Sequence, residues 1–346
     1  MFRVLSTFLR PRRRQTDDPL GTPEFFPMRI DPQRSTMLFV QMSKESFKDS
    51  VFLDSRAVLA GRRTLLAEIP KLRSRRAQSP LHVILHGAFC GSTLLARYFE
   101  QLPRCLVLKE PSILGQLAMA NEAAPALWDE WCDVSLAMLA RSFDSDVAVI
   151  AKAPDMSNWM GDAILDRSPA TKIIFLHSAL NTFLLQTLKD QERRRWLREH
   201  VIHLQDGFSR VPFLCDEAPP DWTDGQCAAA MWLLNSFLCS SLLARPDSDR
   251  VLVMNADDLI SQPQASFLAT ARFLGVLNDK KNRRAAQQIS PMTNHAKDVT
   301  LAYDASTRAA DIARAEEAFG NEVQEAISWA RQVGSDWLPQ SPFPIE

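Results

Sequence analysis

Residues 83 to 99 read VILHGAFCGSTLLARYF and combine signals for a strand, a loop and a helix. Val83 to Leu85 is a short apolar run of the kind found in buried strands. Gly87 and Gly91 interrupt that run, and the apolar residues that follow recur at helical spacing. The sequence therefore predicts a strand, a glycine-containing loop and an amphipathic helix in direct succession.

A loop between a strand end and a helix N-terminus can bind an anion through its backbone. The first N–H groups of a helix have no partner inside the helix, and the helix dipole is positive there. Two glycines let the backbone approach a phosphate or sulfate oxygen, and a Ser or Thr can add a hydroxyl group. The predicted anion-binding residues are Gly87, Ala88, Phe89, Cys90, Gly91, Ser92 and Thr93. The alternative is an ordinary strand-to-helix turn in which Ser92 caps the helix.

The loop lacks one residue of the common nucleoside-triphosphate-binding loops. In those loops a lysine directly precedes the Ser or Thr and reaches the outer phosphates. Gly91 occupies that position here. The pattern therefore argues against a standard ATPase or GTPase.

Three segments resemble the sulfotransferases and occur in that family's order. The strand followed by Gly-Ser-Thr-Leu-Leu is similar to the family's 5′-phosphosulfate loop. Residues 149–180 resemble its third strand, Lys-x-Pro turn, helix and fourth strand, and residues 250–276 resemble its Arg-Val-Leu to Phe-Leu-Gly segment. The resemblance covers residues 81–278. It implies a P-loop fold and 3′-phosphoadenylyl sulfate (PAPS) as the sulfonyl donor.

Two elements of the family's pattern are altered in this chain. Sulfotransferases usually carry Lys or Arg two residues before the loop glycine, where this chain has Phe89. Their 3′-phosphate element has an arginine after the fourth strand and a serine eight residues later, where this chain has His177 and Leu185. Candidate substitutes for the loop cation are Lys152, Lys109 or a residue of the N-terminal tail. Candidate substitutes for the 3′-phosphate element are Ser178, Thr182, Lys189 and the cluster Arg193, Arg194 and Arg195.

The rest of the chain alternates short apolar runs with longer amphipathic segments. Strands are predicted at 37–40, 83–86, 105–108, 147–150, 172–176 and 250–254, and helices at 52–71, 92–102, 112–120, 125–140, 157–166, 180–190, 226–244 and 262–274. Strands separated by helices favour right-handed crossovers. The predicted fold class is α/β, a three-layer P-loop fold with a central parallel sheet flanked by helices.

The predicted domain organisation is a tail followed by one domain. Residues 1–35 are rich in Arg and Pro and are expected to be flexible, and residues 36–346 form the single domain. Its core is 81–278, and a C-terminal lid and helix occupy 279–346. Sulfotransferases often return basic groups to the nucleotide from a loop in this last region, so the resemblance makes His295 and Lys297 candidates for donor binding.

Titratable residues follow three of the predicted strands. In parallel sheets ligands gather at the carboxyl ends of the strands, so these turns are expected to face the loop. The predicted catalytic residues are Glu110 as the base, Lys152 as the cation near the transferring group, and His177, which with Asp155 is the next candidate for the base. Lys109 and Ser178 are predicted to bind the donor.

The assignment of Glu110 has two supports and one alternative. A base must remove the acceptor's proton during sulfonyl transfer, while cations absorb the charge that moves onto the phosphate oxygens. Tyrosine-protein and some carbohydrate sulfotransferases carry a glutamate after the second strand, where Glu110 lies. The alternative is a structural ion pair between Glu110 and a lysine. For Lys109 and Lys152 the alternative is a solvent-exposed turn.

Composition excludes several function classes. The 346 residues carry a net charge of −1, which gives no case for nucleic-acid binding. The Arg-rich N-terminal segment has no uninterrupted apolar core, so it predicts no secretory signal and at most weak contact with a membrane surface. The charge-free run 227–244 is interpreted as a buried helix, and no transmembrane segment is predicted. Six cysteines without CxxC or zinc spacing predict reduced thiols, a cytoplasmic protein and no metal.

The sequence thus predicts transfer of a sulfonyl group from PAPS to a hydroxyl or amine of a small molecule, glycan or peptide. Phosphoryl transfer from a nucleoside triphosphate is an alternative that a Mg²⁺ requirement would favour. A catalytically silent nucleotide-binding or scaffold protein is another, because Phe89 replaces the loop cation. Trp128, Trp131, Trp196 and Trp222 could line an acceptor pocket or belong to the core.

Overall fold

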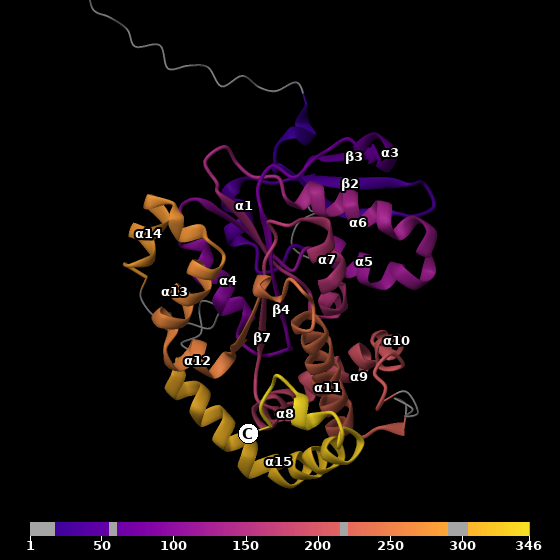
Figure 1. The fold of residues 1–346 in the computed structure, drawn as a ribbon, viewed down its shortest axis with the longest axis vertical. Coiled ribbons are helices and arrows are strands. Elements are labelled where there is room, and N and C mark those ends of the chain that lie inside the picture. The colour runs from indigo at the N-terminus through magenta and orange to yellow at the C-terminus, as the bar shows by residue number, and fades with distance from the viewer. Residues whose placement is uncertain (1–17, 55–60, 215–220, 290–303, 346) are drawn as a thin grey trace, which may run out of the picture.

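The computed structural model describes residues 18–54, 61–214, 221–289 and 304–345, in which two sheets are present (Figure 1). The larger sheet has five parallel strands in the order β5-β6-β4-β7-β8. These strands are β4 (Leu81–His86), β5 (Cys105–Lys109), β6 (Ala148–Lys152), β7 (Ile173–His177) and β8 (Val251–Asn255). The predicted central parallel sheet is confirmed.

Strand β4 occupies the centre of this sheet. On one side it pairs with β6, where Ile84 is opposite Lys152, and on the other with β7, where His86 is opposite Leu176. The chain passes from β4 to β5 and β6 on one side and then to β7 and β8 on the other. In α/β sheets such a reversal of direction is the usual place for a ligand, at the carboxyl ends of the strands. The loop after β4 lies at that point.

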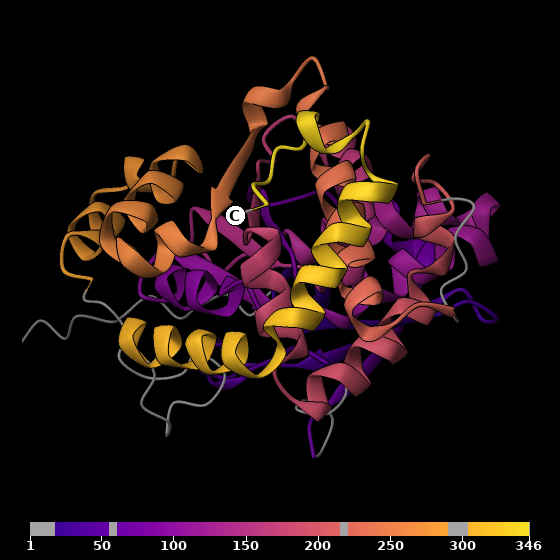
Figure 2. The same ribbon diagram turned by 90° about the horizontal axis from the view of Figure 1, so that it is seen from below.

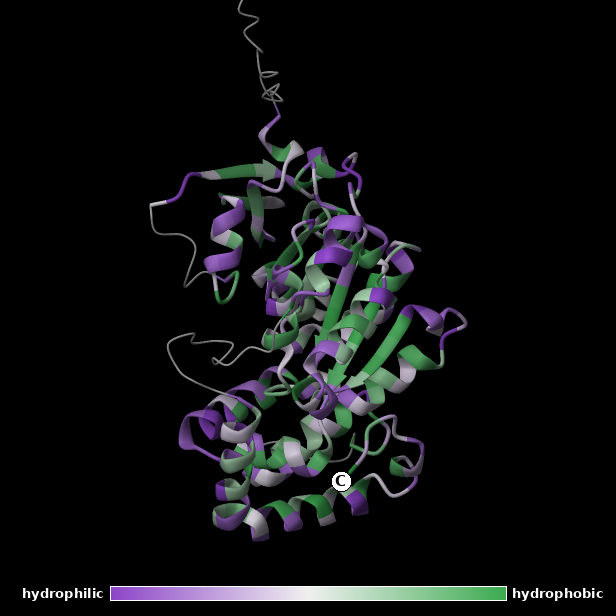
Figure 3. Ribbon diagram, turned by 90° about the vertical axis from the view of Figure 1, so that its left-hand side faces the viewer, coloured by the Kyte–Doolittle hydropathy of each residue, from purple (hydrophilic) through white to green (hydrophobic). Residues whose placement is uncertain are grey.

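Helices cover both faces of the sheet because alternate strand residues enter two different apolar clusters. Ile84 and Ile174 belong to one cluster, while Leu85 and Phe175 belong to the other. The first face is covered by α4 (Ser92–Glu100), α12 (Ala256–Ser261), α13 (Pro263–Phe273) and α14 (Lys280–Ala286). The second is covered by α5 (Ser112–Ala123), α6 (Pro125–Leu139), α7 (Gly161–Arg167), α8 (Leu180–Leu188) and α11 (Asp224–Leu243). The predicted three-layer arrangement is confirmed, with the strands as its most hydrophobic layer (Figure 3).

Helix α11 is the one described helix that is long and apolar enough to cross a membrane, by length and composition only. Most of its apolar window, 67%, is buried inside the structure. It packs against α8, α9 (Gln191–His203) and α15 (Ala305–Val333). Burial of this extent is typical of the core helix of a globular domain, in line with the prediction for residues 227–244.

The long helix α15 runs across α8 and α11, and the chain then turns back over them (Figure 2). The residues after this turn end against the N-terminus of α8. There the N–H of Leu180 donates to the carbonyl of Pro344 at 3.1 Å, and the N–H of Asn181 to that of Ile345 at 3.0 Å. The first donors of α8 are therefore already bound to the chain itself.

The smaller sheet corrects two predictions. Its antiparallel strands are β1 (Phe25–Asp31), β2 (Thr36–Gln41) and β3 (Thr64–Glu68), followed by the short α3 (Ile69–Leu72). The predicted tail, residues 1–35, therefore extends too far, because β1 lies inside it. The predicted helix at 52–71 is wrong in its second half, because residues 64–68 pair with β2; residues 55–60 lie outside the described residues.

A buried arginine attaches this N-terminal segment to the domain. Arg141, only 1% exposed, follows α6 and donates to the carbonyls of Leu20 (2.9 Å), Thr22 (2.8 Å) and Phe25 (2.6 Å). Its guanidinium also lies over the ring of Phe39 in β2. Burial, with a contribution from nearby Arg75, lowers the pKa of Arg141 to about 9. These contacts explain why residues 18–31 are ordered although their composition resembles that of a tail.

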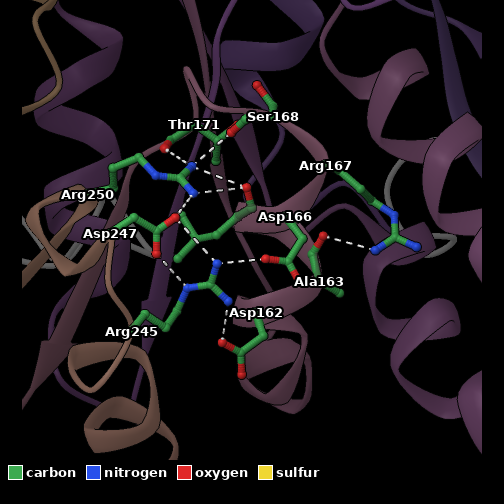
Figure 4. Close-up of polar contacts among 10 residues, drawn as sticks. Asp162, Ala163, Asp166, Arg167, Ser168, Thr171, Arg245, Asp247 and Arg250 are labelled. Atoms are coloured by element: carbon green, nitrogen blue, oxygen red, sulfur yellow. Dashed lines mark hydrogen bonds and ion pairs between the residues drawn. The ribbon is translucent and has the colours of Figure 1, made fainter.

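A second arginine network joins the amino ends of β7 and β8 (Figure 4). Arg250 donates to the carbonyls of Ser168 (2.8 Å) and Thr171 (3.1 Å), and Asp247 pairs with both Arg250 and Arg245. Arg250 begins the Arg-Val-Leu sequence noted above. That arginine stabilises the sheet at the end opposite the loop after β4.

Candidate functional site

The loop after β4 contains two residues in left-handed backbone conformation. Gly91, with φ of 82°, is the N-cap of α4, where glycine is favoured. Phe89, with φ of 58°, adopts a conformation that is rare for a large side chain. Ser92 is the first residue of the helix and not its cap, so the alternative of a Ser92 cap is wrong.

The start of α4 presents donors that have no partner among the described residues. Its first backbone bond joins the N–H of Leu95 to the carbonyl of Gly91 at 3.1 Å, so the N–H groups of Thr93 and Leu94 precede the helical ladder. The hydroxyl of Thr93, a residue 4% exposed, is buried and also has no described partner. Buried donors without partners are costly unless a ligand satisfies them. The N-terminus of α4 is thus suited to an anion, whereas that of α8 is already occupied by carbonyl groups.

Lys152 and Glu110 form an ion pair beside this loop. Lys152 ends β6, the neighbour of β4, and its side chain is 1% exposed, while that of Glu110 is 26% exposed. The N–H of Glu110 donates to the carbonyl of Lys152 at 2.7 Å, and Glu110 has a φ of 51°. The ion pair foreseen as the alternative for Glu110 is therefore present, and the exposed turn foreseen for Lys152 is wrong. The catalytic roles of both residues stay predictions.

His86, which sequence reasoning did not select, lies beneath the loop. Its ring nitrogens are each 2.9 Å from a carbonyl oxygen, Nδ1 from Gly87 and Nε2 from Ala153. Asn158 holds its backbone by accepting from the N–H at 3.2 Å and donating to the carbonyl at 2.8 Å. Burial, together with the charge of Lys152, lowers the pKa of His86 to about 4. The one signal in the sequence for His86 is its place, a polar residue between the apolar run 83–85 and the loop glycine Gly87.

Cys90 contributes backbone and not a reactive side chain. Its sulfur is buried and lies 3.5 Å from the carbonyl of Leu176 in β7. Burial raises the pKa of its thiol to about 12. A thiol with so little thiolate is a poor nucleophile, so the loop is not the site of cysteine chemistry.

Helix α9, which the sequence analysis did not predict, supplies the side chains that pack on Phe89. The ring of Trp196 meets that of Phe89 edge to face, with centroids 5.0 Å apart, and the guanidinium of Arg193 lies 4.2 Å from the centroid of the Phe89 ring. Trp196 also stacks on His200 at 4.6 Å. Trp196 thus lies beside the loop, while Trp131 is 1% exposed and belongs to the core.

His200, on which Trp196 stacks, contacts Asp155 in the turn after β6. Nε2 of His200 lies 3.1 Å from Oδ2 of Asp155, and both side chains are mostly buried. Burial favours neutral His200, but the charge of Asp155 outweighs it and raises the pKa of the imidazole. Burial likewise opposes ionisation of Asp155, yet the charge of His200 and the hydrogen bond with it, with smaller contributions from His86 and Lys152, lower its pKa to about 2. Asp155 is therefore a charged partner of His200.

Other predicted site residues have partners elsewhere. Lys109 is fully buried, and its ammonium bonds to Glu100 in α4 and to the carbonyl of Lys48 at 2.9 Å. Its exposed-turn alternative is wrong, and its contacts favour a structural role over the predicted donor binding. Thr182 and Lys189 lie on α8 and just after it.

The end of β7 is covered by the returning C-terminal segment. The ring of His177 stacks on Phe343 with centroids 4.1 Å apart, and burial lowers its pKa to about 4. The carbonyl of Ser178 accepts from the indole of Trp232 at 2.9 Å. The roles predicted for His177 and Ser178 stay predictions. His295 and Lys297 lie outside the described residues.

No three His, Cys, Asp or Glu side chains come together in the described ranges in a way that could hold a metal ion. Cys90, Cys105, Cys132, Cys227 and Cys239, the described cysteines, are buried and free.

Comparisons with known proteins give structural similarity only. No protein-family model matches the chain, and no curated protein matches it. Solved sulfotransferase structures are similar to it. One from Mycobacterium tuberculosis has a TM-score of 0.42 at 13% identity, over 73% of this chain and 79% of that one. The sulfotransferase domain from the curacin biosynthetic pathway has a TM-score of 0.40 at 15% identity, over 71% and 98%. These values are low, so the function proposed below depends on the residues of the site.

Proposed function

We propose that the chain is a sulfotransferase-like enzyme that binds PAPS at loop 87–93 and transfers its sulfonyl group to a hydroxyl or amine acceptor. The observation that carries the proposal is the Glu110–Lys152 pair beside the unpartnered donors of α4. A carboxylate can accept the acceptor's proton, and a buried ammonium can stabilise the charge of the leaving phosphate. Both groups therefore match a requirement of this reaction.

Each residue has a defined part in the proposed step. The acceptor atom attacks the sulfur, the bond between sulfur and the phosphate oxygen breaks, and the acceptor's proton passes to Glu110. The N–H groups of Thr93 and Leu94 hold the phosphate, and Lys152 stabilises the negative charge that it gains. The products are the sulfonated acceptor and adenosine 3′,5′-bisphosphate. We further propose a small molecule, glycan or peptide as the acceptor and the cytoplasm as the location, which suits buried free thiols.

Binding of the product nucleotide tests the donor site with a matched pair of variants. Lys152→Met and Lys109→Met each remove a buried ammonium from the last residue of neighbouring strands, and each leaves one glutamate without its partner. We expect Lys152→Met to weaken binding of adenosine 3′,5′-bisphosphate about 10-fold or more, since a hydrogen bond to a charged group is lost. Lys109→Met should change it less than about threefold. Isothermal titration calorimetry measures both, and thermal unfolding verifies that each variant folds.

Two results would contradict the proposal in different ways. Equal effects of the two substitutions would exclude Lys152 from the donor site. Wild-type protein that binds ATP with Mg²⁺ more tightly than the bisphosphate would replace sulfonyl transfer with phosphoryl transfer, since Mg²⁺ neutralises triphosphate charge.

The base is tested by turnover. Glu110→Gln keeps the shape of the side chain but cannot accept the proton, so release of adenosine 3′,5′-bisphosphate from PAPS should fall about 10²-fold or more. The assay uses PAPS with a panel of phenols, alcohols and amines. Binding of the bisphosphate should change little. Unaltered turnover in the variant, with an acceptor that the wild type sulfonates, would assign the pair a purely structural role.

A further inference from the structure

Position 89 of the loop carries an aromatic ring that is held from outside the loop. A left-handed conformation at a residue as large as Phe89 persists only where its surroundings stabilise it. Its surroundings include the ring of Trp196, which meets it edge to face, and the guanidinium of Arg193, both on α9. Through Phe89, the guanidinium of Arg193 on α9 is thus connected to the backbone of loop 87–93.

Arg193 is held in place before any ligand arrives. Its backbone N–H donates to Oδ1 of the N-cap Asp190 at 2.9 Å, and its Nε lies 3.3 Å from Oδ2 of the same residue. Its Nη1 donates to Oε1 of Gln186 at 3.1 Å and to the carbonyl of Gln186. The side chain is 22% exposed. Fixed donors of this kind bind an anion with little loss of rotamer freedom.

The neighbouring arginines of the same cluster differ in their surroundings. Arg194 makes a bidentate contact with Glu322 in α15, at 2.8 Å for each nitrogen, and a further bond to Asp224. Arg195 is exposed to solvent. Arg193 is the arginine of this cluster whose guanidinium lies over the ring of Phe89 in the loop.

We infer that Arg193 supplies, from α9, the cation that loop position 89 lacks, and that its guanidinium binds the phosphosulfate group at the outer side of the loop. The inference rests on the proposed function and makes α9 part of the donor site. In this arrangement Phe89 positions the guanidinium by cation–π contact, and the ammonium of Lys152 contacts the phosphate from the inner side of the same loop. The donor's phosphate would lie between cations from two elements.

The test uses binding of adenosine 3′,5′-bisphosphate by calorimetry at low and high salt. Arg193→Gln should weaken binding about 10-fold or more at low salt, and the deficit should shrink at high salt because a charge interaction has been lost. Arg193→Lys should recover part of the affinity, and Arg195→Gln, on the same helix, should stay within about twofold of wild type. In the double variant Phe89→Lys/Arg193→Gln, the loop lysine should restore most of the lost affinity.

The outcomes separate the two claims. Wild-type protein that does not bind the bisphosphate overturns the proposed function and this inference with it. If wild type binds while Arg193→Gln behaves like Arg195→Gln, only the inference fails. A deficit in Arg193→Gln that is the same at both salt concentrations would show a packing effect of α9 and would equally overturn it. Thermal unfolding of each variant confirms that the compared proteins are folded.

Discussion

At the scale of single residues, the buried histidines make the protein sensitive to acid. Burial lowers the pKa of His82, His86 and His177 from 6.5 to about 4. In the unfolded chain each binds a proton once the pH falls below 6.5, but in the folded protein each stays neutral until about pH 4. The unfolded state therefore gains protons first, and stability present above pH 6.5 is lost as the pH falls toward 4. The pKa of His200 is raised, so its effect on stability has the opposite dependence on pH. His200 stabilises the folded protein below pH 6.5, and this stabilisation is lost as the pH rises through the folded pKa.

His177 allows this prediction to be tested. His177→Phe keeps the stacking on Phe343 and removes the titrating ring, so the loss of unfolding free energy between pH 7 and pH 5 should shrink by up to about 2 kcal/mol. Urea unfolding at the two pH values measures this difference. His203→Phe, at an exposed position, is the control and should leave it unchanged. A His177→Phe protein as sensitive to acid as the wild type would show that the folded pKa of His177 is not depressed.

At the scale of elements, Arg141 decides whether the N-terminal sheet stays attached. Arg141→Met leaves the carbonyls of Leu20, Thr22 and Phe25 buried without a donor, which should lower the free energy of unfolding by about 3 kcal/mol or more. Equilibrium urea unfolding measures this loss. Arg314→Met, whose arginine is 70% exposed, should change it by less than about 0.5 kcal/mol. A loss below 1 kcal/mol for Arg141→Met would mean that water replaces the guanidinium.

The sequence predicts the elements whose apolar pattern is complete and misses those that depend on distant partners. Strand β4 and helix α4 are predicted because each carries a full apolar face. Helix α9 is missed because it buries little more than Leu197, His200 and Val201, and arginines cover the rest. Strand β3 is missed because its residues are half-exposed and ordered by pairing with β2.

In the candidate site, too, the local features can be predicted from the sequence and the contacts between distant segments cannot. Loop 87–93 is local, so glycine spacing predicts it, and the Glu110–Lys152 pair follows from two strand ends in a parallel sheet. The stack on Phe89 could not be predicted, because Arg193 and Trp196 reach the loop from more than a hundred residues away in the chain. The partner of Lys109 likewise depends on how α4 crosses β5.

At the scale of the whole molecule, the strand order constrains when the sheet can form during synthesis. Strand β4 is made first, but both of its neighbours come later, β6 at residues 148–152 and β7 at 173–177. Until then the two edges of this strand, every residue of which is buried in the folded protein, have no partner, and long-range parallel pairing is slow. The nascent chain therefore exposes an aggregation-prone segment over the time needed to add about ninety residues, roughly 5–20 s at usual rates of translation. Chaperone binding to that segment, and synonymous codon changes that slow or speed translation between β4 and β7, become determinants of the yield of folded protein.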